Sequence, residues 1–319
     1  MTILSEQPLI LAYHDAHSGR HKAQLWQERL AAYFPNLRFV DLLDDAAEAA
    51  EAALVWRPPA GRLAALPKLQ VILSLGQGVD HLFSDSDLPL SVPACRIVDP
   101  QMSVAMGHWV VGAILDHMRS GPAYRAQAAA RIWQACPQPD ARQLPVGIYG
   151  IGAIGRVVAK MVAGLGFPVY GWSRQEKKIA GINCLSGDAG LQQMLATCHY
   201  HVCLLPLTAE TEGLFDASAF AAMPEGAYFL NGGRGGHVRE DDLLAAIRAR
   251  HLSGAALDVF AEEPLVPSHP FWDEETIAIF PHVAAQTDAN TAAEQIAHAI
   301  HAVRTGQQPA NQVSIDRGY

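Results

Sequence analysis

The sequence lacks the features that mark several large classes of protein. It has no basic surplus, because 23 lysines and arginines face 32 aspartates and glutamates, for a net charge of −9. Such a chain is poorly suited to neutralising phosphates, so we expect no nucleic-acid partner. No apolar run is long enough to span a bilayer, and the N-terminal stretch MTILSEQPLILAYHDAH has no basic start. We therefore expect no membrane contact, no secretory signal and a cytoplasmic location.

Cysteine is scarce, and its spacing is irregular. The five cysteines include no C-x-x-C pair, which favours reduced thiols over a disulfide framework. The stretch CHYHVC, residues 198–203, raises a metal-site hypothesis because two cysteines and two histidines lie close together. If YHVCLLP is a strand, His201 and Cys203 share one face and Cys198 lies at its start or outside it. We favour a buried strand and expect no metal.

Short β-rich runs alternate with amphipathic helical stretches along most of the chain. The first series of predicted strands covers residues 9–14, 37–42, 53–56 and 71–74. The second series covers residues 146–149, 169–172, 202–205, 228–230, 255–259 and 277–280. Repeated β-α units are typical of α/β proteins, in which helices cover a parallel sheet.

A long stretch with helical periodicity, residues 102–133, separates the two series. Together with the length of 319 residues, this connector predicts two doubly wound parallel-sheet domains. The last helical stretch, TAAEQIAHAIHAVRTG, could return to the first domain. We therefore predict that a second domain, residues 99–286, is inserted in a discontinuous first domain, residues 1–98 and 287–319.

A glycine motif follows the predicted strand 146–149. It places Gly150, Gly152 and Gly155 in a G-x-G-x-x-G pattern, with Ala153 and Ile154 opening a helix. The pattern alone is weak, but between a strand and a helix it is typical of dinucleotide binding, with the pyrophosphate at the helix N-terminus. The alternative is a plain strand–turn–helix connection.

The end of the next strand indicates which cofactor binds. NAD sites usually place a carboxylate there for the ribose 2′-hydroxyl, whereas this chain has Ser173 and Arg174. Arg174 can pair with a 2′-phosphate through its fork of donors, so we expect NADP rather than NAD. The nearby Glu176 weakens this argument, and the alternative is that Arg174 is only a solvated loop residue.

Further polar residues follow the strands of the second series, where ligands bind in open α/β sheets. Arg234 follows one strand within the motif NGGRGG, Asp258 follows the next, and His282 follows the last. An arginine can hold a substrate carboxylate in two hydrogen bonds, and a histidine can protonate a carbonyl oxygen as hydride arrives. A carboxylate beside the histidine would favour its protonated form, and either Glu262 or Glu263 could supply it.

The motifs YGIGAIG, LLPLT, NGGRGGHV, LDVFAEEPL and PHVAA occur in the same order in one known family. With them, nearly the whole chain resembles the D-isomer-specific 2-hydroxyacid dehydrogenases. The segments VWRPP, LGQGVDHL, WSR, AYFLN and the terminal RGY make it similar to the glyoxylate/hydroxypyruvate reductase A branch of that family.

The resemblance implies a reductase of small 2-oxo acids whose catalytic residues are Arg234, Glu263 and His282. It also implies a homodimer with the long helices in the interface. In the fold that it implies, residues 99–286 form a Rossmann cofactor domain inserted in a flavodoxin-like substrate domain, residues 1–98 and 287–319. The substrate site would comprise Trp56, Arg57, Leu75, Gly76, Gln77 and Gly78. The cofactor would contact Leu205, Pro206, Asn231, Gly232, Gly233 and Asp258, besides the glycine loop, Ser173 and Arg174.

The chain departs from the family pattern at Gly232-Gly233, at Gln77 and at His108, which leaves the preferred substrate open. Two alternatives to a glyoxylate and hydroxypyruvate reductase also remain. One is a reductase of bulkier 2-oxo acids. The other is a non-catalytic NADP(H)-sensing protein of the corepressor kind on the same scaffold.

Overall fold

The computed structural model describes residues 3–16 and 20–313. The chain divides into two compact units, which we call unit 1 (Met1–Asp99 and Gln286–Tyr319) and unit 2 (Pro100–Ala285). The RGY motif at the C-terminus, residues 317–319, lies outside the described residues. That unit 1 binds substrate and unit 2 binds cofactor stays a prediction.

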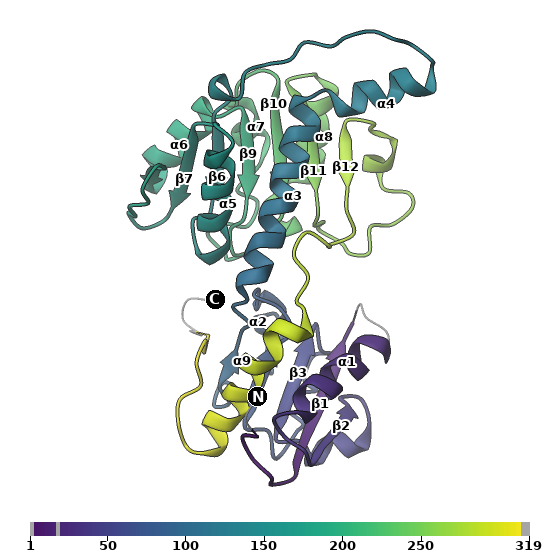
Figure 1. Cartoon of the computed structure of the whole chain (residues 1–319), viewed down its shortest axis with the longest axis vertical. Coiled ribbons are helices and arrows are strands. Elements are labelled where there is room, and N and C mark those ends of the chain that lie inside the picture. The colour runs from purple at the N-terminus through teal and green to yellow at the C-terminus, as the bar shows by residue number, and fades with distance from the viewer. Residues whose placement is uncertain (1–2, 17–19, 314–319) are drawn as a thin grey trace. The chain divides into compact units, whose positions relative to one another are not determined.

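Unit 1 is built on a five-stranded sheet in the order β2-β1-β3-β4-β5, with every pair parallel (Figure 1). Its strands are β1 (Leu9–Asp15), β2 (Leu37–Asp41), β3 (Ala52–Trp56), β4 (Val71–Ser74) and β5 (Ala94–Cys95). Its helices are α1 (Arg20–Ala31), the 3-10 turn η1 (Asp45–Ala49), α2 (Asp80–Phe83) and α9 (Ala289–Arg304).

Helices cover both faces of this sheet. On one face Trp26 and Leu30 of α1 and Ile296 of α9 pack against Leu11 and Leu54 of the sheet. The other face packs against η1, α2 and the loop that follows β3. Because α9 comes from the end of the chain, unit 1 is formed by two separate segments.

Unit 2 contains a seven-stranded parallel sheet in the order β12-β11-β10-β9-β6-β7-β8. Its strands are β6 (Val146–Tyr149), β7 (Val169–Ser173), β8 (Asn183–Ser186), β9 (Tyr200–Cys203), β10 (Ala227–Asn231), β11 (Leu252–Leu257) and β12 (Ile277–Ile279). Its helices are α3 (Pro100–Met118), α4 (Gly121–Ala129), α5 (Ala153–Gly164), α6 (Gly187–Thr197), α7 (Ala217–Ala221) and α8 (Glu240–Arg248). Short 3-10 turns are η2 (Ala141–Gln143), η3 (Gly235–His237) and η4 (Pro270–Asp273).

Successive residues of each central strand in unit 2 pack on opposite faces, as the pleat requires. Phe229 packs with residues of α6, α7 and α8, whereas Tyr228 and Leu230 pack with residues of α3 and α5. Figure 1 shows these helices on the two faces of the sheet. Both faces are therefore apolar and covered. The prediction of two doubly wound parallel sheets is confirmed.

The structure differs from the predicted elements in a few places. The helix expected over residues 102–133 stops at Met118, because Ser120 takes a left-handed conformation (φ 58°) before Gly121-Pro122 start α4. The short edge strands β5 and β8 were not predicted. In the described parts of the chain, no helix is long and apolar enough to cross a membrane.

The residues of the CHYHVC stretch are accounted for by the core. His201 is fully buried in β9, where its Nδ1 accepts a hydrogen bond from the hydroxyl of Tyr149 (2.8 Å) and its Nε2 donates to the Cys198 carbonyl (2.9 Å). Burial lowers the pKa of His201 to about 3, so its ring is neutral. No cluster of metal-ligating side chains occurs among the described residues.

Candidate active site

Three neighbouring strands of unit 2 end beside one another and carry the polar residues of the candidate active site. Backbone hydrogen bonds continue the sheet past its strands: Asp258 N donates to Asn231 O (3.0 Å), and His282 N donates to Asp258 O (2.9 Å). The segments that follow β10, β11 and β12 therefore lie next to one another. This edge is where ligands bind in parallel α/β sheets.

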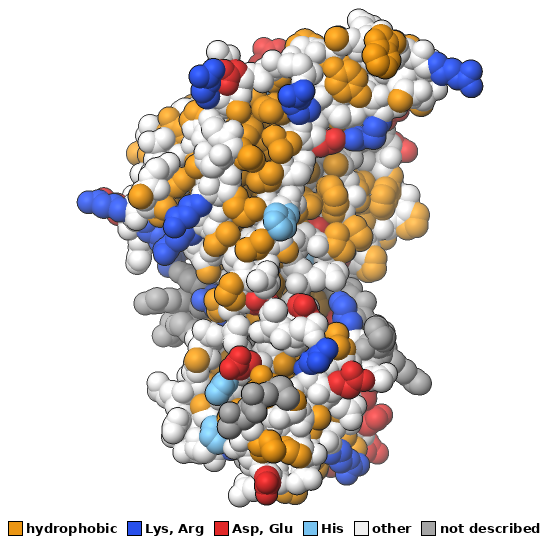
Figure 2. All heavy atoms as spheres, viewed as in Figure 1, with side chains coloured by type: hydrophobic (Ala, Val, Ile, Leu, Met, Phe, Trp, Pro, Cys, Tyr) orange, Lys and Arg blue, Asp and Glu red, His pale blue; other side chains and the backbone are white. Residues whose placement is uncertain are grey.

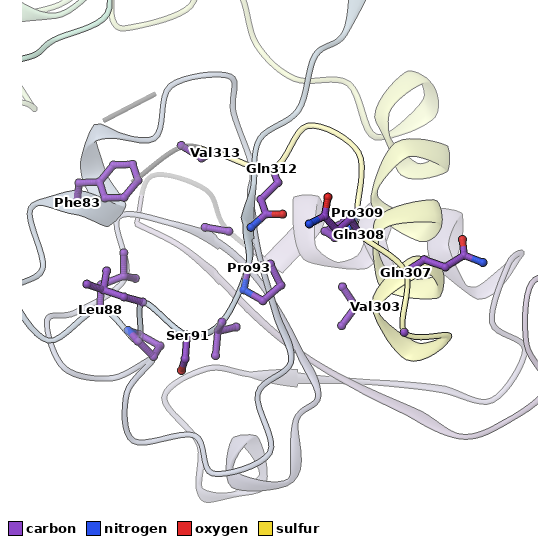
Figure 3. A pocket seen from close by; sticks show the side chains of 15 residues that line it. Phe83, Leu88, Ser91, Pro93, Val303, Gln307, Gln308, Pro309, Gln312 and Val313 are labelled. Carbon is purple, nitrogen blue, oxygen red and sulfur yellow. The ribbon is translucent and has the colours of Figure 1, made fainter. Parts of the chain in front are cut away.

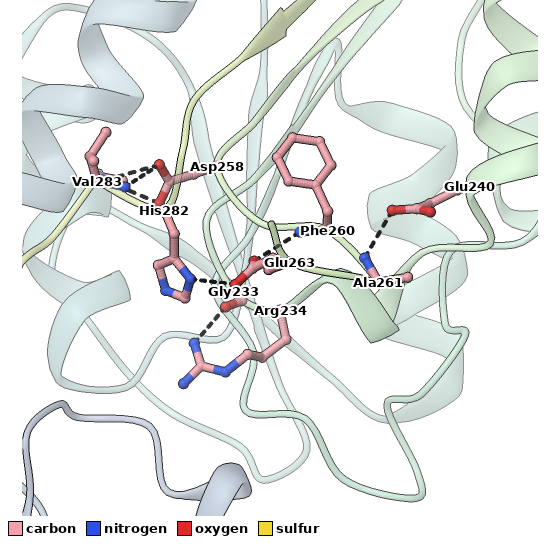
Figure 4. A network of polar contacts seen from close by, with 10 residues as sticks. Gly233, Arg234, Glu240, Asp258, Phe260, Ala261, Glu263, His282 and Val283 are labelled. Carbon is pink, nitrogen blue, oxygen red and sulfur yellow. Dashed lines mark hydrogen bonds and ion pairs between the residues drawn. The ribbon is translucent and has the colours of Figure 1, made fainter. Parts of the chain in front are cut away.

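Glu263 and His282 form a close pair at this edge (Figure 4). The Oε2 of Glu263 is 3.0 Å from Nδ1 of His282, and its Oε1 accepts the Phe260 N–H at 3.1 Å. The side chain of Glu263 is only 9% exposed, whereas that of His282 is 32% exposed. A carboxylate at this distance can accept the proton of Nδ1 and fixes the orientation of the ring. Of the two glutamates that the sequence left open, the structure brings Glu263 to the histidine.

Asp258 fixes the backbone around His282. Its Oδ1 accepts the N–H groups of Val283 (2.8 Å) and Ala284 (3.0 Å), and Figure 4 shows the carboxylate directed at this turn. His282 itself has a left-handed backbone (φ 54°), which costs free energy for a non-glycine residue and needs such support. Burial raises the pKa of the Asp258 carboxyl to about 6, although both backbone donors oppose that shift. A contact between Asp258 and the cofactor stays a prediction.

Arg234 follows β10 and is held by two buried side chains. Asn231 donates from Nδ2 to the Arg234 carbonyl (2.9 Å), and its Oδ1 accepts the Gly233 N–H (3.1 Å). The Nδ1 of His237 accepts the N–H of Arg234 at 3.1 Å. The guanidinium donates from Nη1 to the Gly233 carbonyl at 2.8 Å. Sequence reasoning did not single out His237, because a histidine that caps a backbone turn leaves no periodic signal.

The glycines of NGGRGG allow close packing around Arg234. A Cβ at Gly235 would lie 1.8 Å from the carbonyl carbon of Phe260, so only glycine lets this loop approach the segment that carries Glu263. A Cβ at Gly232 would meet Met106 and Trp109 of α3 at 2.9 and 3.2 Å. The space at Gly232 is therefore filled by α3.

The glycine loop after β6 is shaped to receive a dinucleotide. Gly150 has a φ of 98°, and a Cβ there would lie 2.7 Å from the Leu204 carbonyl oxygen. A Cβ at Gly155 would clash with the Gly150 carbonyl oxygen at 1.9 Å, so this glycine lets α5 start close to the strand. By contrast, nothing lies within 4 Å of a Cβ at Gly152, which is exposed with Ala153 at the N-terminus of α5. These features fit a pyrophosphate bound against the helix N-terminus.

Leu205 and Pro206 follow β9, which neighbours β6 in the sheet. The loop is fastened by Thr211, whose Oγ1 donates to the Pro206 carbonyl at 2.7 Å and accepts the Thr208 N–H at 2.9 Å. Chain connections diverge at this β9–β6 boundary, which is the usual place for a dinucleotide in a doubly wound sheet.

The loop after β7 carries Arg174 and Lys177, with Glu176 between them. Ser173 is buried and donates to the Gln175 carbonyl (2.8 Å), while Arg174 extends outward and pairs with Glu210 (2.8 Å). Lys177, which the sequence analysis passed over, reaches back to the Ile151 carbonyl of the glycine loop at 3.2 Å. This donor set suits a 2′-phosphate better than a ribose hydroxyl.

In unit 1 the predicted substrate residues gather at the carboxyl ends of β3 and β4. Trp56 packs on the loop 75–78, where a Cβ at Gly76 would lie 2.7 Å from its ring. Arg57 has a left-handed backbone (φ 49°), and its N–H donates to Nδ1 of His81 at 3.2 Å.

Ser74 and His81 hold this loop together, and neither was identified from the sequence. The Ser74 hydroxyl donates to the Gly78 carbonyl (3.1 Å) and accepts the Gly76 N–H (3.2 Å). His81 approaches the same hydroxyl through Nε2 at 3.1 Å. Gln77 differs from these residues, because its buried Oε1 has no hydrogen-bond partner in the part of the chain that the structure describes. A buried acceptor without a donor costs about 1–3 kcal/mol, so a ligand that offers a donor would relieve that cost.

A separate cavity of about 300 Å³ lies in unit 1, between residues 83–94 and 303–313 (Figure 3). Apolar side chains such as Phe83 and Leu88 line it together with three glutamines, and none of the described residues that line it is charged. This lining differs from the polar residues that follow the strands of unit 2.

Comparison with known proteins gives one family. Residues 111–284 match the family model described as D-isomer specific 2-hydroxyacid dehydrogenase, NAD binding domain. The chain is 35% identical over 303 residues to the glyoxylate/hydroxypyruvate reductase A of Yersinia enterocolitica, covering 93% of this chain and 97% of that protein.

Two solved structures extend the likeness to the whole fold. One is a D-isomer specific 2-hydroxyacid dehydrogenase from Xanthobacter autotrophicus in complex with NADPH and MES, with a TM-score of 0.90 and 36% identity over 98% of this chain and 100% of that one. The other is an NADPH-dependent glyoxylate/hydroxypyruvate reductase from Sinorhizobium meliloti in complex with NADP and sulfate. Its TM-score is 0.89, with 34% identity over 98% of this chain and 100% of that one.

Proposed function

This chain belongs to the D-isomer specific 2-hydroxyacid dehydrogenase family, and from that premise we propose that it reduces glyoxylate and hydroxypyruvate with NADPH. The family match and the glyoxylate/hydroxypyruvate reductases among the relatives confirm the prediction of the family and of a reductase of small 2-oxo acids. The observation that carries the proposal to this chain is the Glu263–His282 pair, set beside Arg234 at one sheet edge.

In this proposal His282 is the acid. Its Nδ1 faces the buried carboxylate of Glu263, which fixes the orientation of the ring. His282 gives the proton on Nε2 to the carbonyl oxygen of the oxo acid, which becomes the hydroxyl of the product. Bound NADPH supplies the hydride that the carbonyl carbon gains, and in the reverse direction Nε2 takes the proton back.

Arg234 binds the substrate carboxylate and polarises the carbonyl. Its backbone is fixed on both sides by Asn231 and His237, so the guanidinium is presented with little loss of conformational entropy. The backbone of Leu75–Gly78 offers a second site for the carboxylate, and Trp56 and Arg57 border it. These assignments rest on the family pattern together with the positions of the residues in their own units.

The cofactor binds in unit 2. Gly150, Gly152 and Gly155 receive the pyrophosphate at the start of α5, with Ala153 and Ile154 in its first turn. Ser173 and Arg174 take the adenosine ribose and its 2′-phosphate. The residues after β9 and β10, Leu205-Pro206 and Asn231–Gly233, line the remainder of the dinucleotide, and Asp258 contacts the nicotinamide amide.

We also propose a homodimer. The segment formed by α4 and the loop after it, residues 121–140, carries Trp133, which is fully exposed, and Ile132, which is 52% exposed. No residue of α4 is buried, and Figure 2 shows apolar side chains on this segment, which we call the arm. Exposed apolar surface of this kind is typical of an interface between subunits. The cytoplasm is the proposed location, which cell fractionation can test.

Replacement of Arg234 by alanine tests the site. We expect Arg234→Ala to lower kcat/KM for glyoxylate and hydroxypyruvate by about a hundredfold or more, because a charged, bidentate contact to the carboxylate is lost. The Kd for NADPH, measured by fluorescence, should change little. A variant that retains most of its activity contradicts the assignment.

A panel of 2-oxo acids in an NADPH-oxidation assay distinguishes the alternatives. Turnover of the two small acids supports the proposal. Faster turnover of aromatic acids would favour the bulkier-substrate enzyme. NADPH binding with no turnover of any acid would favour the sensing protein.

A further inference from the structure

Arg174, the residue proposed to bind the 2′-phosphate, is in contact with a carboxylate. Its Nη1 lies 2.8 Å from Oε2 of Glu210, which belongs to the loop after β9. The two side chains are 56% and 67% exposed, so water and ligand can reach both. The pair joins the ends of β7 and β9, on either side of β6 and its glycine loop.

The backbone of Glu210 is held in place by its neighbours. Thr208 N donates to Oγ1 of Thr211 (2.9 Å), and Glu212 N donates to the Thr208 carbonyl (2.9 Å). Glu210 therefore lies in a hydrogen-bonded turn. We expect its exposed side chain, and not its backbone, to move when a ligand approaches Arg174.

We propose that Glu210 is a specificity-determining residue that weakens the selectivity of the protein for NADPH over NADH. A 2′-phosphate that binds Arg174 must either displace the Glu210 carboxylate from Arg174 or lie next to that carboxylate. In the second case the negative charges of the phosphate and the carboxylate repel each other. NADH carries no such phosphate and meets neither cost. This inference rests on the proposed NADPH-dependent function.

The size of the effect follows from the exposure of the pair. Exposed ion pairs contribute about 0.2–1 kcal/mol, which corresponds to about a 1.4- to fivefold change in a dissociation constant. Salt should reduce the effect, because solvent-exposed charges are screened. Arg174 therefore still favours NADPH, by a smaller margin than it would without Glu210.

The test measures Kd for NADPH and NADH by fluorescence titration of the full chain and of Glu210→Gln, at low and high salt. We expect NADPH to bind about two- to fivefold more tightly to the variant at low salt, with the Kd for NADH unchanged. The matched control is Glu212→Gln, which removes the same charge from the same loop. Glu212 has no ion pair among the described residues, so this variant should bind both cofactors like the wild type.

The variant Arg174→Ala shows whether Glu210 weakens NADPH binding through Arg174. If Glu210 acts through Arg174, then Glu210→Gln should give a much smaller gain for NADPH in the Arg174→Ala background. An unchanged NADPH Kd in Glu210→Gln, or an equal gain in Glu212→Gln, would overturn the proposal. An equal gain for NADH would also overturn it.

The proposed role of Glu210 and the proposed reaction can be contradicted separately. A shift in the Kd ratio without turnover of any 2-oxo acid would support the role of Glu210 and contradict the proposed reaction. Turnover of the oxo acids, with the same ratio of Kd values for NADPH and NADH in Glu210→Gln as in the wild type, would support the reaction and contradict the role of Glu210. Failure of the wild type to bind NADPH would overturn both.

Discussion

At the scale of single residues, the candidate site depends on side chains that hold other side chains in place. Glu263 fixes the ring of His282, Asp258 fixes its backbone, and Asn231 with His237 fixes Arg234. Each of these supports is buried or nearly so, where a hydrogen bond is stronger and a missing one costs more. The reacting groups are thus held before substrate arrives.

Replacing Glu263 by glutamine tests the coupling between this residue and His282. The amide keeps the size of the side chain but is a weaker acceptor for the Nδ1 proton, so the ring of His282 is held less firmly. We expect Glu263→Gln to lower kcat/KM for hydroxypyruvate by about tenfold or more, with the Kd for NADPH little changed. A wild-type kcat/KM in this variant would contradict the pairing. Glu262→Gln is the matched control, which should keep the wild-type kcat/KM.

Residue identity was partly predictable for the site. Arg234 and His282 could be found because both follow predicted strands, and parallel strands bring their carboxyl ends to one edge. The choice between Glu262 and Glu263 could not be made from spacing, since both lie in one loop. His237 and Glu210 were not found, because one bonds to a backbone turn and the other pairs with a residue 36 positions away.

At the scale of elements, the ends of the predicted strands lie within three residues of the observed ones, whereas the end of the long helix was not predictable. Apolar runs bounded by polar residues mark the buried strands, but β8 is polar and at an edge, and β5 has only two residues. Helical periodicity in the sequence continues beyond Met118, so the pattern does not show that the helix ends before Ser120. Backbone conformation at that one residue separates α3 from α4.

Helix α3 is joined to the sheet through His117. Its Nδ1 accepts the Tyr200 hydroxyl at 3.0 Å, and its Nε2 donates at 3.1 Å to Ser253, which in turn donates to the Ala227 carbonyl. The ring also stacks on Tyr228 at a centroid distance of 4.1 Å. A neutral imidazole satisfies every one of these bonds.

Substitution of His117 by phenylalanine should therefore destabilise unit 2. The ring stacking can persist, but the buried Tyr200 hydroxyl loses its acceptor, which costs about 1–3 kcal/mol in the free energy of unfolding. Urea denaturation gives this quantity. His298, which is 57% exposed on α9, provides the control, and His298→Phe should change stability by less than about 0.5 kcal/mol. Equal stabilities for the two variants would contradict the role given to His117.

At the scale of the whole molecule, buried histidines make stability depend on pH. Burial lowers the pKa of His117 to about 4 and that of His201 to about 3, and burial also lowers the pKa of His199. Below about pH 6.5 the unfolded chain binds protons that the folded chain does not, so stability falls as pH falls. Asp258 acts in the opposite direction between about pH 4 and 6, because its pKa is raised in the folded state.

We therefore expect a net loss of stability on acidification. With His117 and His201 partly offset by Asp258, the free energy of unfolding should fall by about 1 kcal/mol per pH unit between pH 6 and pH 4. Urea denaturation across that range measures it. Constant stability down to pH 4 would contradict the burial of neutral histidines in β9 and α3.

The exposed arm predicts the oligomeric state. A homodimer should show a mass of twice 34.4 kDa by light scattering, and Trp133→Asp should shift the protein toward the monomer mass. Trp272→Asp is the control, because Trp272 is also exposed but lies on η4, outside the arm. A monomeric wild type at micromolar concentration would contradict the proposed interface.

The most direct test of the central claim is the product formed from hydroxypyruvate by the wild-type protein with NADPH. Chiral chromatography, combined with the loss of NADPH absorbance, gives both the configuration and the stoichiometry. We expect the protein to consume one NADPH for each D-glycerate that it forms, and to reduce glyoxylate as well. Formation of the L-isomer, or no NADPH consumption above the protein-free rate with either acid, would contradict it.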